Sequence, residues 1–167
     1  MKICIFSDSH GDSGTMCGVV EKERPDMIIY LGDGIEDAEE LSRRYPDIEI
    51  VKNLGNVDSR KEDEEWIKYA EICGKRFMMT HGHTFIDKAE GLFKGQQDMF
   101  MYANNVDIVL YGHCHEPFIN CCGNKWIMSP GRIGRSRNIQ KANLKPTYGV
   151  LEISGSGALT WQFSEVE

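Results

Sequence analysis

The stretch KICIFSDSHGD, residues 2–12, runs from apolar strand-forming residues directly into a polar loop. The same pattern returns in MIIYLGDG, residues 27–34, and in IEIVKNLGNVD, residues 48–58. The segments between them, Ser13 to Arg24 and Ile35 to Tyr45, have the composition of helices. Short apolar strands that alternate with helices are typical of βαβ units and of a parallel sheet buried on both faces. The first part of the chain therefore predicts an α/β fold.

The second part of the chain has a different pattern, in which strand pairs joined by tight turns replace the alternation with helices. A helix is expected from Ile86 to Asn104, followed by the strand DIVLYGH, residues 107–113. These features predict two sheets packed together with helices outside, in one domain that spans residues 1–167. Hairpin turns are predicted at Cys73-Gly74, at Gly123-Asn124 and between Gly155 and Gly157.

The size and charge of the chain exclude several classes of protein. A mass of 19.0 kDa fits one domain with a real core. The net charge of −7 disfavours a protein that binds duplex nucleic acid or an anionic membrane. No apolar stretch approaches a membrane span or a signal peptide, so we expect no membrane association and a cytoplasmic location. None of the six cysteines forms a CxxC pair, which favours free thiols.

The charged residues are unevenly distributed along the chain. Residues 117–151 contain no Asp or Glu but several Lys and Arg. This segment is open to two interpretations, a solvated basic loop or a rim that attracts anions. The acidic cluster EDAEE, residues 36–40, is expected to be a solvated helix or loop face.

Polar side chains follow the strand-like runs at the point where each run ends. In open α/β sheets, binding sites form outside the carboxyl ends of the strands, so these side chains are expected to meet at one edge. All five histidines of the chain belong to this set. The set consists of Asp8, His10, Asp33, Asn56, His81, His83, His113 and His115.

Each motif also has a purely structural interpretation when it is taken alone. Asp8 and His10 could cap the following helix, and Gly32-Asp33-Gly34 and Gly55-Asn56 could be turn chemistry. The placement of every histidine at a strand end favours a metal site instead. The ligands are too many for one tetrahedral zinc ion, and mixed nitrogen and oxygen ligands suit Mn, Fe, Zn, Ni or Co. One carboxylate that bridges two ions would account for the surplus.

The ordered motifs resemble those of the calcineurin-like metallophosphoesterases, most closely the small phosphodiesterase branch. That branch shares its fold with the retromer scaffold subunit. The resemblance extends from residue 3 to about residue 137 and implies a four-layer α/β/β/α sandwich of two mixed sheets. The matched motifs are Asp8-x-His10, Gly32-Asp33, Gly55-Asn56, His81 and Gly112-His113-x-His115.

The resemblance implies a binuclear-metal-dependent phosphodiesterase in which a metal-bridging hydroxide attacks the phosphorus of a small phosphorylated substrate. Two divalent ions are the expected cofactors, with Mn²⁺ first and Fe, Zn, Ni or Co as alternatives. Asp33 would bridge the two ions. Carried over motif by motif, one ion would be held by Asp8, His10, Asp33 and His115, and the other by Asp33, Asn56, His81 and His113.

Two departures from the family pattern bear on activity. Larger members carry a histidine after the Asn of the GN motif that helps to protonate the leaving group, whereas this chain has Val57. General-acid help is typically worth ~10²–10⁴-fold, so the departure favours diesters over monoesters. With Asp33, His83 is assigned a catalytic role, in which it orients substrate, donates a proton or supports a ligand through a hydrogen bond.

The second departure lies in SPGRIGRSR, residues 129–137, where relatives read Asn-Pro-Gly-Ser. Arg132 and Arg137 are candidates to bind substrate phosphate together with Asn56, because guanidinium pairs with phosphate oxygens through two hydrogen bonds. A surface role is the alternative for each arginine.

Three rival functions remain open from the sequence. The first is a non-catalytic metal-binding scaffold of the same fold. The second is a nuclease or nucleotide pyrophosphatase that uses the same metal centre, and the third is a mononuclear metal-binding protein. The predicted hairpins could also support a homodimer.

Overall fold

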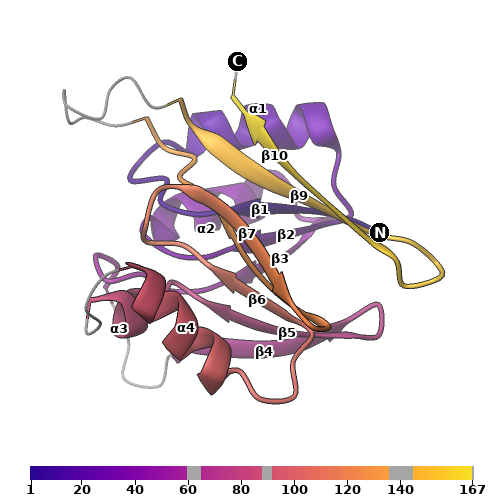
Figure 1. Ribbon diagram of the computed structural model, residues 1–167. Helices are drawn as coiled ribbons and strands as arrows, with labels where there is room; N and C mark the ends of the chain where they lie inside the picture. Colours follow the sequence, from indigo (N-terminus) through magenta and orange to yellow (C-terminus); the bar gives the residue numbers. More distant parts are fainter. Residues whose placement is uncertain (60–64, 88–91, 136–144, 167) are drawn as a thin grey trace.

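The computed structural model describes residues 1–59, 65–87, 92–135 and 145–166 (Figure 1). Within these residues, the strands form two mixed sheets of five strands each, with helices outside. The elements in chain order are β1 (Lys2–Phe6), α1 (Ser13–Glu23), β2 (Met27–Tyr30), α2 (Ile35–Arg44), β3 (Glu49–Lys52), β4 (Ile67–Ile72), β5 (Lys75–Thr80), α3 (His83–Ile86), α4 (Leu92–Tyr102), β6 (Ile108–Tyr111), β7 (Pro117–Cys122), β8 (Lys125–Pro130), β9 (Thr147–Ile153) and β10 (Leu159–Glu165).

The first sheet has the strand order β10-β9-β1-β2-β3. Its β1, β2 and β3 run parallel, with Ile5 opposite Ile29 and Ile29 opposite Val51. The hairpin of β9 and β10 adds two antiparallel strands beside β1. The parallel half confirms the βαβ units predicted from the first part of the sequence.

The second sheet has the strand order β4-β5-β6-β8-β7, with parallel strands in the middle and an antiparallel strand at each edge. Its two hairpins turn at Cys73-Gly74 and at Gly123-Asn124, as the sequence predicts. Cys73, Gly74 and Gly123 have φ values of 50°, 71° and 62°, the left-handed conformation that tight hairpin turns require.

The main core lies between the two sheets. Ile5 and Ile29 of the first sheet pack there against Met79 and Leu110 of the second. The outer face of the first sheet is covered by α1 and α2, and that of the second by α4 (Figure 1). The layers are therefore helix, sheet, sheet and helix, which confirms the predicted four-layer sandwich.

The helix expected from Ile86 to Asn104 is wrong in its start and its continuity. The structure has a short α3 that begins at His83, and α4 begins only at Leu92. A Cβ atom on Gly95 would lie 2.8 Å from Ile86 Cα, so the two helices cross in direct backbone contact. One straight helix cannot bring Ile86 against Gly95, so α3 and α4 are separate helices.

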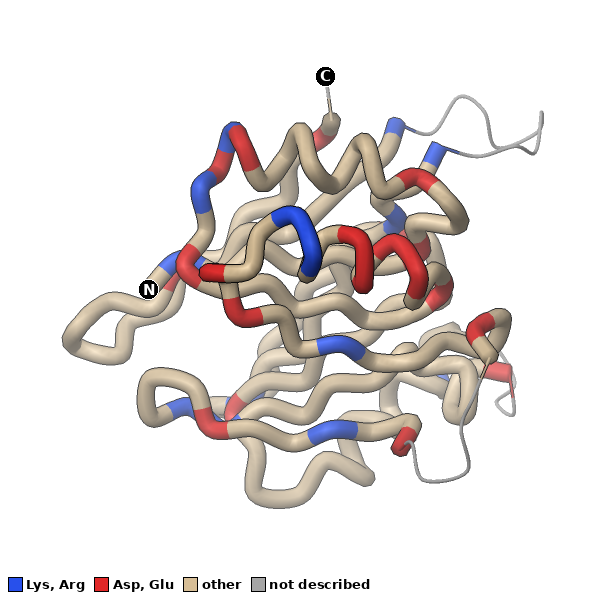
Figure 2. Tube along the Cα trace, turned by 180° about the vertical axis from the view of Figure 1, so that it is seen from behind, with Lys and Arg blue, Asp and Glu red and all other residues tan. Residues whose placement is uncertain are grey.

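The charged residues of α2 are placed where they interact favourably with its helix dipole. Glu36 and Asp37 lie in its first turn, and Arg43 and Arg44 lie in its last (Figure 2). The expectation that residues 36–40 form a solvated face is wrong for Asp37, which is 8% exposed. Among the helices within the described ranges, none combines the length and apolar content needed to cross a membrane.

Candidate metal centre

The candidate ligands lie in the loops that follow β1, β2, β3, β5 and β6, at the edge where the carboxyl ends of these strands meet. Two groups have ligand atoms that all lie within 4.8 Å of one another. Asp8 belongs to both groups, as the shared member. The groups are Asp8, His10 and His115, and Asp8, Asp33 and His81.

Asp8 lies at the centre of the cluster and is 0% exposed. Its Oδ1 atom accepts no hydrogen bond from any residue that the structure describes. Three imidazole Nε2 atoms nevertheless surround it, from His115 at 3.1 Å, His10 at 3.8 Å and His81 at 3.9 Å. A buried carboxylate oxygen without a partner is costly, and a cation at this point would satisfy it.

The ring of His81 is oriented by its backbone contact. Its Nδ1 atom donates to the Leu31 carbonyl at 2.9 Å, so Nε2 is the nitrogen that faces the other candidate ligands. That Nε2 atom lies 3.1 Å from Asn56 Oδ1 and 3.3 Å from Asp33 Oδ2. Burial lowers the pKa of His81, but the hydrogen bond with Asp33 and the charge of Asp8 shift the pKa upward overall. Nitrogen and oxygen donors thus converge on one point.

Asp33 is held as a carboxylate within this group. Burial acts to raise its pKa, but the hydrogen bond and charge of His81 outweigh burial and place the pKa below its ordinary value. Its second oxygen, Oδ1, accepts a hydrogen bond from the backbone N–H of Val57 at 3.1 Å. Asp33 therefore presents an ionised oxygen to the cluster at neutral pH.

The backbone is strained at the ligand positions. Five of the expected ligands have positive φ, a conformation that non-glycine residues rarely adopt. Such residues cost about 1–3 kcal/mol each and concentrate at functional sites. The five are Asp8 (59°), His10 (48°), Asp33 (64°), His113 (69°) and His115 (61°).

Several hydrogen bonds join the two sheets at this edge. His81 Nδ1 reaches Leu31 O, and Asn53 Nδ2 donates to Met79 O at 2.9 Å. The backbone N–H of His113 donates to Asp8 Oδ2 at 3.1 Å. The relative position of ligands from different sheets is fixed by these contacts.

Asp58, which the sequence analysis did not assign, holds the loop that carries Asp33. Its Oδ2 atom accepts from Asp33 N and Gly55 N, each at 2.8 Å. Its Oδ1 atom accepts from Gly34 N at 2.7 Å and Ile35 N at 2.9 Å. The signal in the sequence is a carboxylate directly after the GN turn, where Asp favours local backbone hydrogen bonds.

Asp37, also missed, supports the loop after β1. Its Oδ2 atom accepts from Ser9 Oγ at 2.6 Å and from Gly11 N at 2.7 Å. Asp12 is the residue that caps α1, with its side chain accepting from Thr15 N at 3.1 Å. Asp8 and His10 are therefore not helix caps.

His113 lies at the edge of the cluster, and its ring is 5.1 Å from that of His81. It belongs to neither of the two ligand groups. Its Nε2 atom contacts Asp87 Oδ1 at 2.7 Å. The assignments of His113 and Asn56 to the second ion, and of Asp33 as the bridge, stay predictions.

His83 borders the cluster at the first position of α3. Its ring lies 5.6 Å from that of His81 and 4.7 Å from that of Trp66, which it meets edge to face. Burial, followed by the charges of His81 and His113, lowers the pKa of His83. His83 is therefore a neutral imidazole beside the site at pH 7.

Arg132 does not face solvent, because it is only 4% exposed. Burial lowers its pKa, and the negative charge of Asp8 acts in the opposite direction. A direct contact with substrate phosphate stays a prediction. Arg137 lies outside the described residues.

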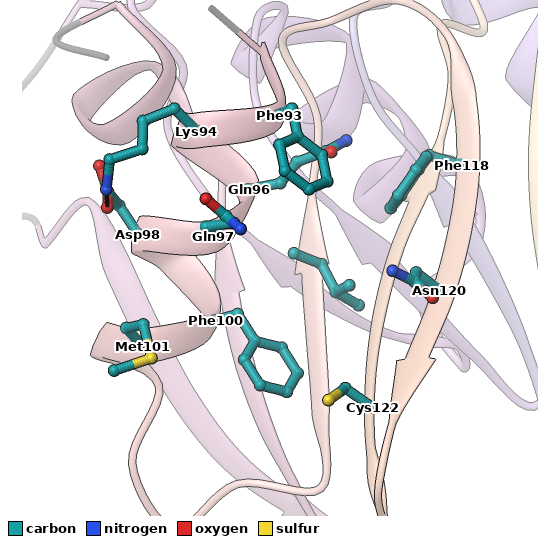
Figure 3. Close-up of a pocket in the computed structure, with 11 residues that line it drawn as sticks. Phe93, Lys94, Gln96, Gln97, Asp98, Phe100, Met101, Phe118, Asn120 and Cys122 are labelled. Atoms are coloured by element: carbon teal, nitrogen blue, oxygen red, sulfur yellow. Dashed lines mark hydrogen bonds and ion pairs between the residues drawn. The ribbon is translucent and has the colours of Figure 1, made fainter. Parts of the chain in front are cut away.

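An apolar cleft lies away from these ligands, between α4 and the hairpin of β7 and β8 (Figure 3). Phe93, Phe100 and Phe118 point into it, and its volume is about 420 Å³. Its Lys94 and Asp98 pair with each other. The cleft lacks converging ligands for a phosphate or a metal ion among the described residues that line it.

The sequence profile of the calcineurin-like phosphoesterase superfamily domain matches residues 1–156. The chain belongs to this superfamily. Its members are phosphoesterases that use divalent metal ions, and the two ligand groups around Asp8 are candidates to hold such ions. A phosphodiesterase of Methanocaldococcus jannaschii is 26% identical over 174 residues, which cover 91% of this chain and 93% of that protein.

Solved structures share the fold at low sequence identity. A predicted phosphoesterase of Streptococcus pneumoniae is 24% identical, with a TM-score of 0.70 over 98% of this chain and 88% of that chain. A single mutant of Vps29 from Entamoeba histolytica is 18% identical, with a TM-score of 0.73 over 100% of both chains. These two likenesses confirm the sandwich fold.

Proposed function

We propose that this protein is a phosphodiesterase whose centre holds two divalent metal ions. The observation that carries the proposal is the buried Asp8 Oδ1 atom, which accepts no hydrogen bond from the described residues. Three imidazole nitrogens lie around it without satisfying it. This donor set of carboxylate and imidazole suits Mn, Fe, Zn, Ni or Co.

The residues fit two ions better than one. His10 and His115 form one group of candidate ligands with Asp8, and Asp33 and His81 form a second group with it. Two ions, when bound, would supply an activated water and neutralise charge that develops on phosphorus. The chain itself supplies two carboxylates in this centre, so a pair of divalent ions leaves a net positive site that attracts an anionic phosphoryl group.

The surroundings favour diesters. Val57 offers no proton to a leaving group and is 63% exposed beside the Asp33 loop. His83 is neutral and borders the cluster, so it can support ligand orientation or donate a hydrogen bond to substrate. A monoester that releases an alkoxide needs a proton donor for this leaving group, and Val57 cannot supply one. A diester with an activated leaving group depends less on such a donor.

The test is the hydrolysis of bis-p-nitrophenyl phosphate, an activated diester, and of phenyl phosphate, a monoester with a poor leaving group, by metal-stripped protein that has been refilled with Mn²⁺. We expect Mn²⁺-dependent cleavage of the diester, weak cleavage of the monoester and loss of both in Asp33→Asn. Asp98→Asn on α4, remote from the cluster, is the matched control and should keep full activity. Equal activity of Asp33→Asn and the control would overturn the proposal.

A scaffold of the same fold is the second candidate, favoured by the likeness to Vps29 over the whole chain. A scaffold would bind metal without turning over either ester. A nuclease or nucleotide pyrophosphatase would use the same centre, and single-stranded oligonucleotides and dinucleoside polyphosphates as added substrates would separate it from a phosphodiesterase of small substrates.

A further inference from the structure

Asp87 contacts one of the proposed metal ligands. Its Oδ1 atom lies 2.7 Å from His113 Nε2, and a carboxylate at this distance accepts the N–H of the ring. Asp87 sits at the C-cap of α3, outside the motifs that carry the family resemblance. Neither its sequence position nor the ligand pattern marked it as functional.

The contact decides which nitrogen of His113 remains available. A neutral imidazole has one N–H and one lone pair. Because Nε2 donates its proton to Asp87, the lone pair lies on Nδ1. Metal-binding histidines commonly donate their other ring N–H to a carboxylate, which fixes the ring and raises its basicity as a ligand.

Both partners are fixed by their backbones. The N–H of His113 donates to Asp8 Oδ2, and the N–H of Gly112 donates to His81 O at 3.0 Å. The N–H of Asp87 donates to His83 O at 3.0 Å, in a helix that packs against α4 through Ile86. Rotation of the His113 ring is therefore the main freedom left, and Asp87 removes it.

We propose that Asp87 is a positioning residue that holds the His113 ring with Nδ1 as the nitrogen that would be available to the second metal ion. The proposal rests on the proposed two-ion centre. The side chain of Asp87 is 56% exposed, so solvent competes for the hydrogen bond. Removal of such partners typically weakens metal binding by 10–100-fold, and we expect about tenfold here.

The experiment is calorimetric titration of metal-stripped protein with Mn²⁺, which counts bound ions and measures each affinity without any substrate. The variants are Asp87→Ala and Asp87→Asn, with Asp98→Asn as the control for loss of an exposed carboxylate on the neighbouring helix. Thermal unfolding of the metal-free proteins checks that the fold is kept.

In Asp87→Ala we expect two ions to bind still, with one of the two affinities weakened about tenfold and the other unchanged. Asp87→Asn should fall in between, because its amide oxygen can still accept the hydrogen bond. Affinities in Asp87→Ala equal to those of the control would overturn the role of Asp87. A loss of one bound ion at saturation would also overturn it, since Asp87 would then be a ligand itself. Binding of fewer than two ions by the unaltered protein would instead overturn the two-ion centre.

Discussion

The carboxylate of Asp58 holds the backbone of Asp33, because its Oδ2 atom accepts the Asp33 N–H at 2.8 Å. The same side chain accepts three more backbone N–H groups around the two adjoining turns. Asp33 has a φ of 64°, and a loop in this conformation needs such support. The position of a proposed ligand is thus set by a residue outside the ligand set.

Asp58→Ala should destabilise the protein and weaken its metal binding together. Its four backbone N–H groups would lose a charged acceptor, and water can replace it only in part because Asp58 is half-buried. We expect a loss of about 2–3 kcal/mol in the free energy of unfolding. Urea denaturation of the metal-free protein measures this, and Asp47→Ala, at an exposed turn, is the control. Equal midpoints for the two variants would contradict the role of Asp58.

Gly55→Ala should disrupt the site through a steric clash. A Cβ atom at this position would lie 2.0 Å from Asp33 Oδ1 and 2.4 Å from Asp33 N. We expect a loss of more than 2 kcal/mol in unfolding free energy, in the range of overpacking substitutions. Gly18→Ala on the exposed side of α1 meets nothing within 4 Å, so it should gain about 0.5–1 kcal/mol. Melting temperatures that shift in the same direction for both variants would count against this account.

Asp8→Asn should separate stability from metal binding. Replacement of a buried carboxylate whose Oδ1 lacks a hydrogen bond removes a desolvated charge, so the metal-free protein should be at least as stable as before. Saturating Mn²⁺ should stabilise the unaltered protein, by about 2.7 kcal/mol at one hundred times the dissociation constant, and should hardly affect the variant. Thermal melts with and without Mn²⁺ give both quantities. A full Mn²⁺ shift in Asp8→Asn would show that the metal binds elsewhere.

Val57→His should introduce monoesterase activity. Its backbone N–H contacts Asp33 Oδ1, and its exposed side chain leaves room for an imidazole beside the site. General-acid help is worth ~10²–10⁴-fold, and we expect about 10²-fold in kcat/KM for a monoester with a poor leaving group. Val57→Ala is the control, and phenyl phosphate hydrolysis is the measurement. An unchanged rate in a folded, metal-loaded Val57→His would argue against the missing proton donor as the cause of diester preference.

Asp107, which lies far from the candidate metal ligands, makes the stability of the protein depend on pH. The backbone N–H of Arg76 at 2.8 Å, and then its guanidinium, lower the pKa of Asp107. Because the folded-state pKa is depressed, the stabilisation is present at neutral pH and is lost as the pH falls below about 4 and through that pKa. Asp107→Asn should therefore lower the melting temperature at pH 7 more than at pH 3. The same difference at both values would contradict this assignment.

The parts of the fold that repeat a local pattern could be predicted from the sequence. Alternation of apolar strands and helices gave the parallel strands, and Gly123-Asn124 gave a hairpin turn. The gathering of Asp8, Asp33 and His81 also followed, because parallel strands end at one edge. Such features depend on periodicity and turn chemistry within a short stretch.

The remaining features depend on contacts between distant segments. Asp37 lies in an acidic cluster for which the sequence predicts exposure to solvent, but Ser9 and Gly11 of another loop donate hydrogen bonds to its side chain. Arg132 is predicted either to bind substrate phosphate or to lie at the surface, and the surface alternative is wrong because Arg132 is only 4% exposed. Gly95 of α4 allows a close contact with α3, because Ile86 lies directly against it. A single sequence carries no local signal for such contacts.

The most direct test of the central claim is the turnover of bis-p-nitrophenyl phosphate at zero, one and two equivalents of bound Mn²⁺ per chain. We predict no turnover in the stripped protein and full activity only when the second equivalent has bound. Two bound equivalents without turnover of the diester would contradict the claim and would favour a metal-binding scaffold.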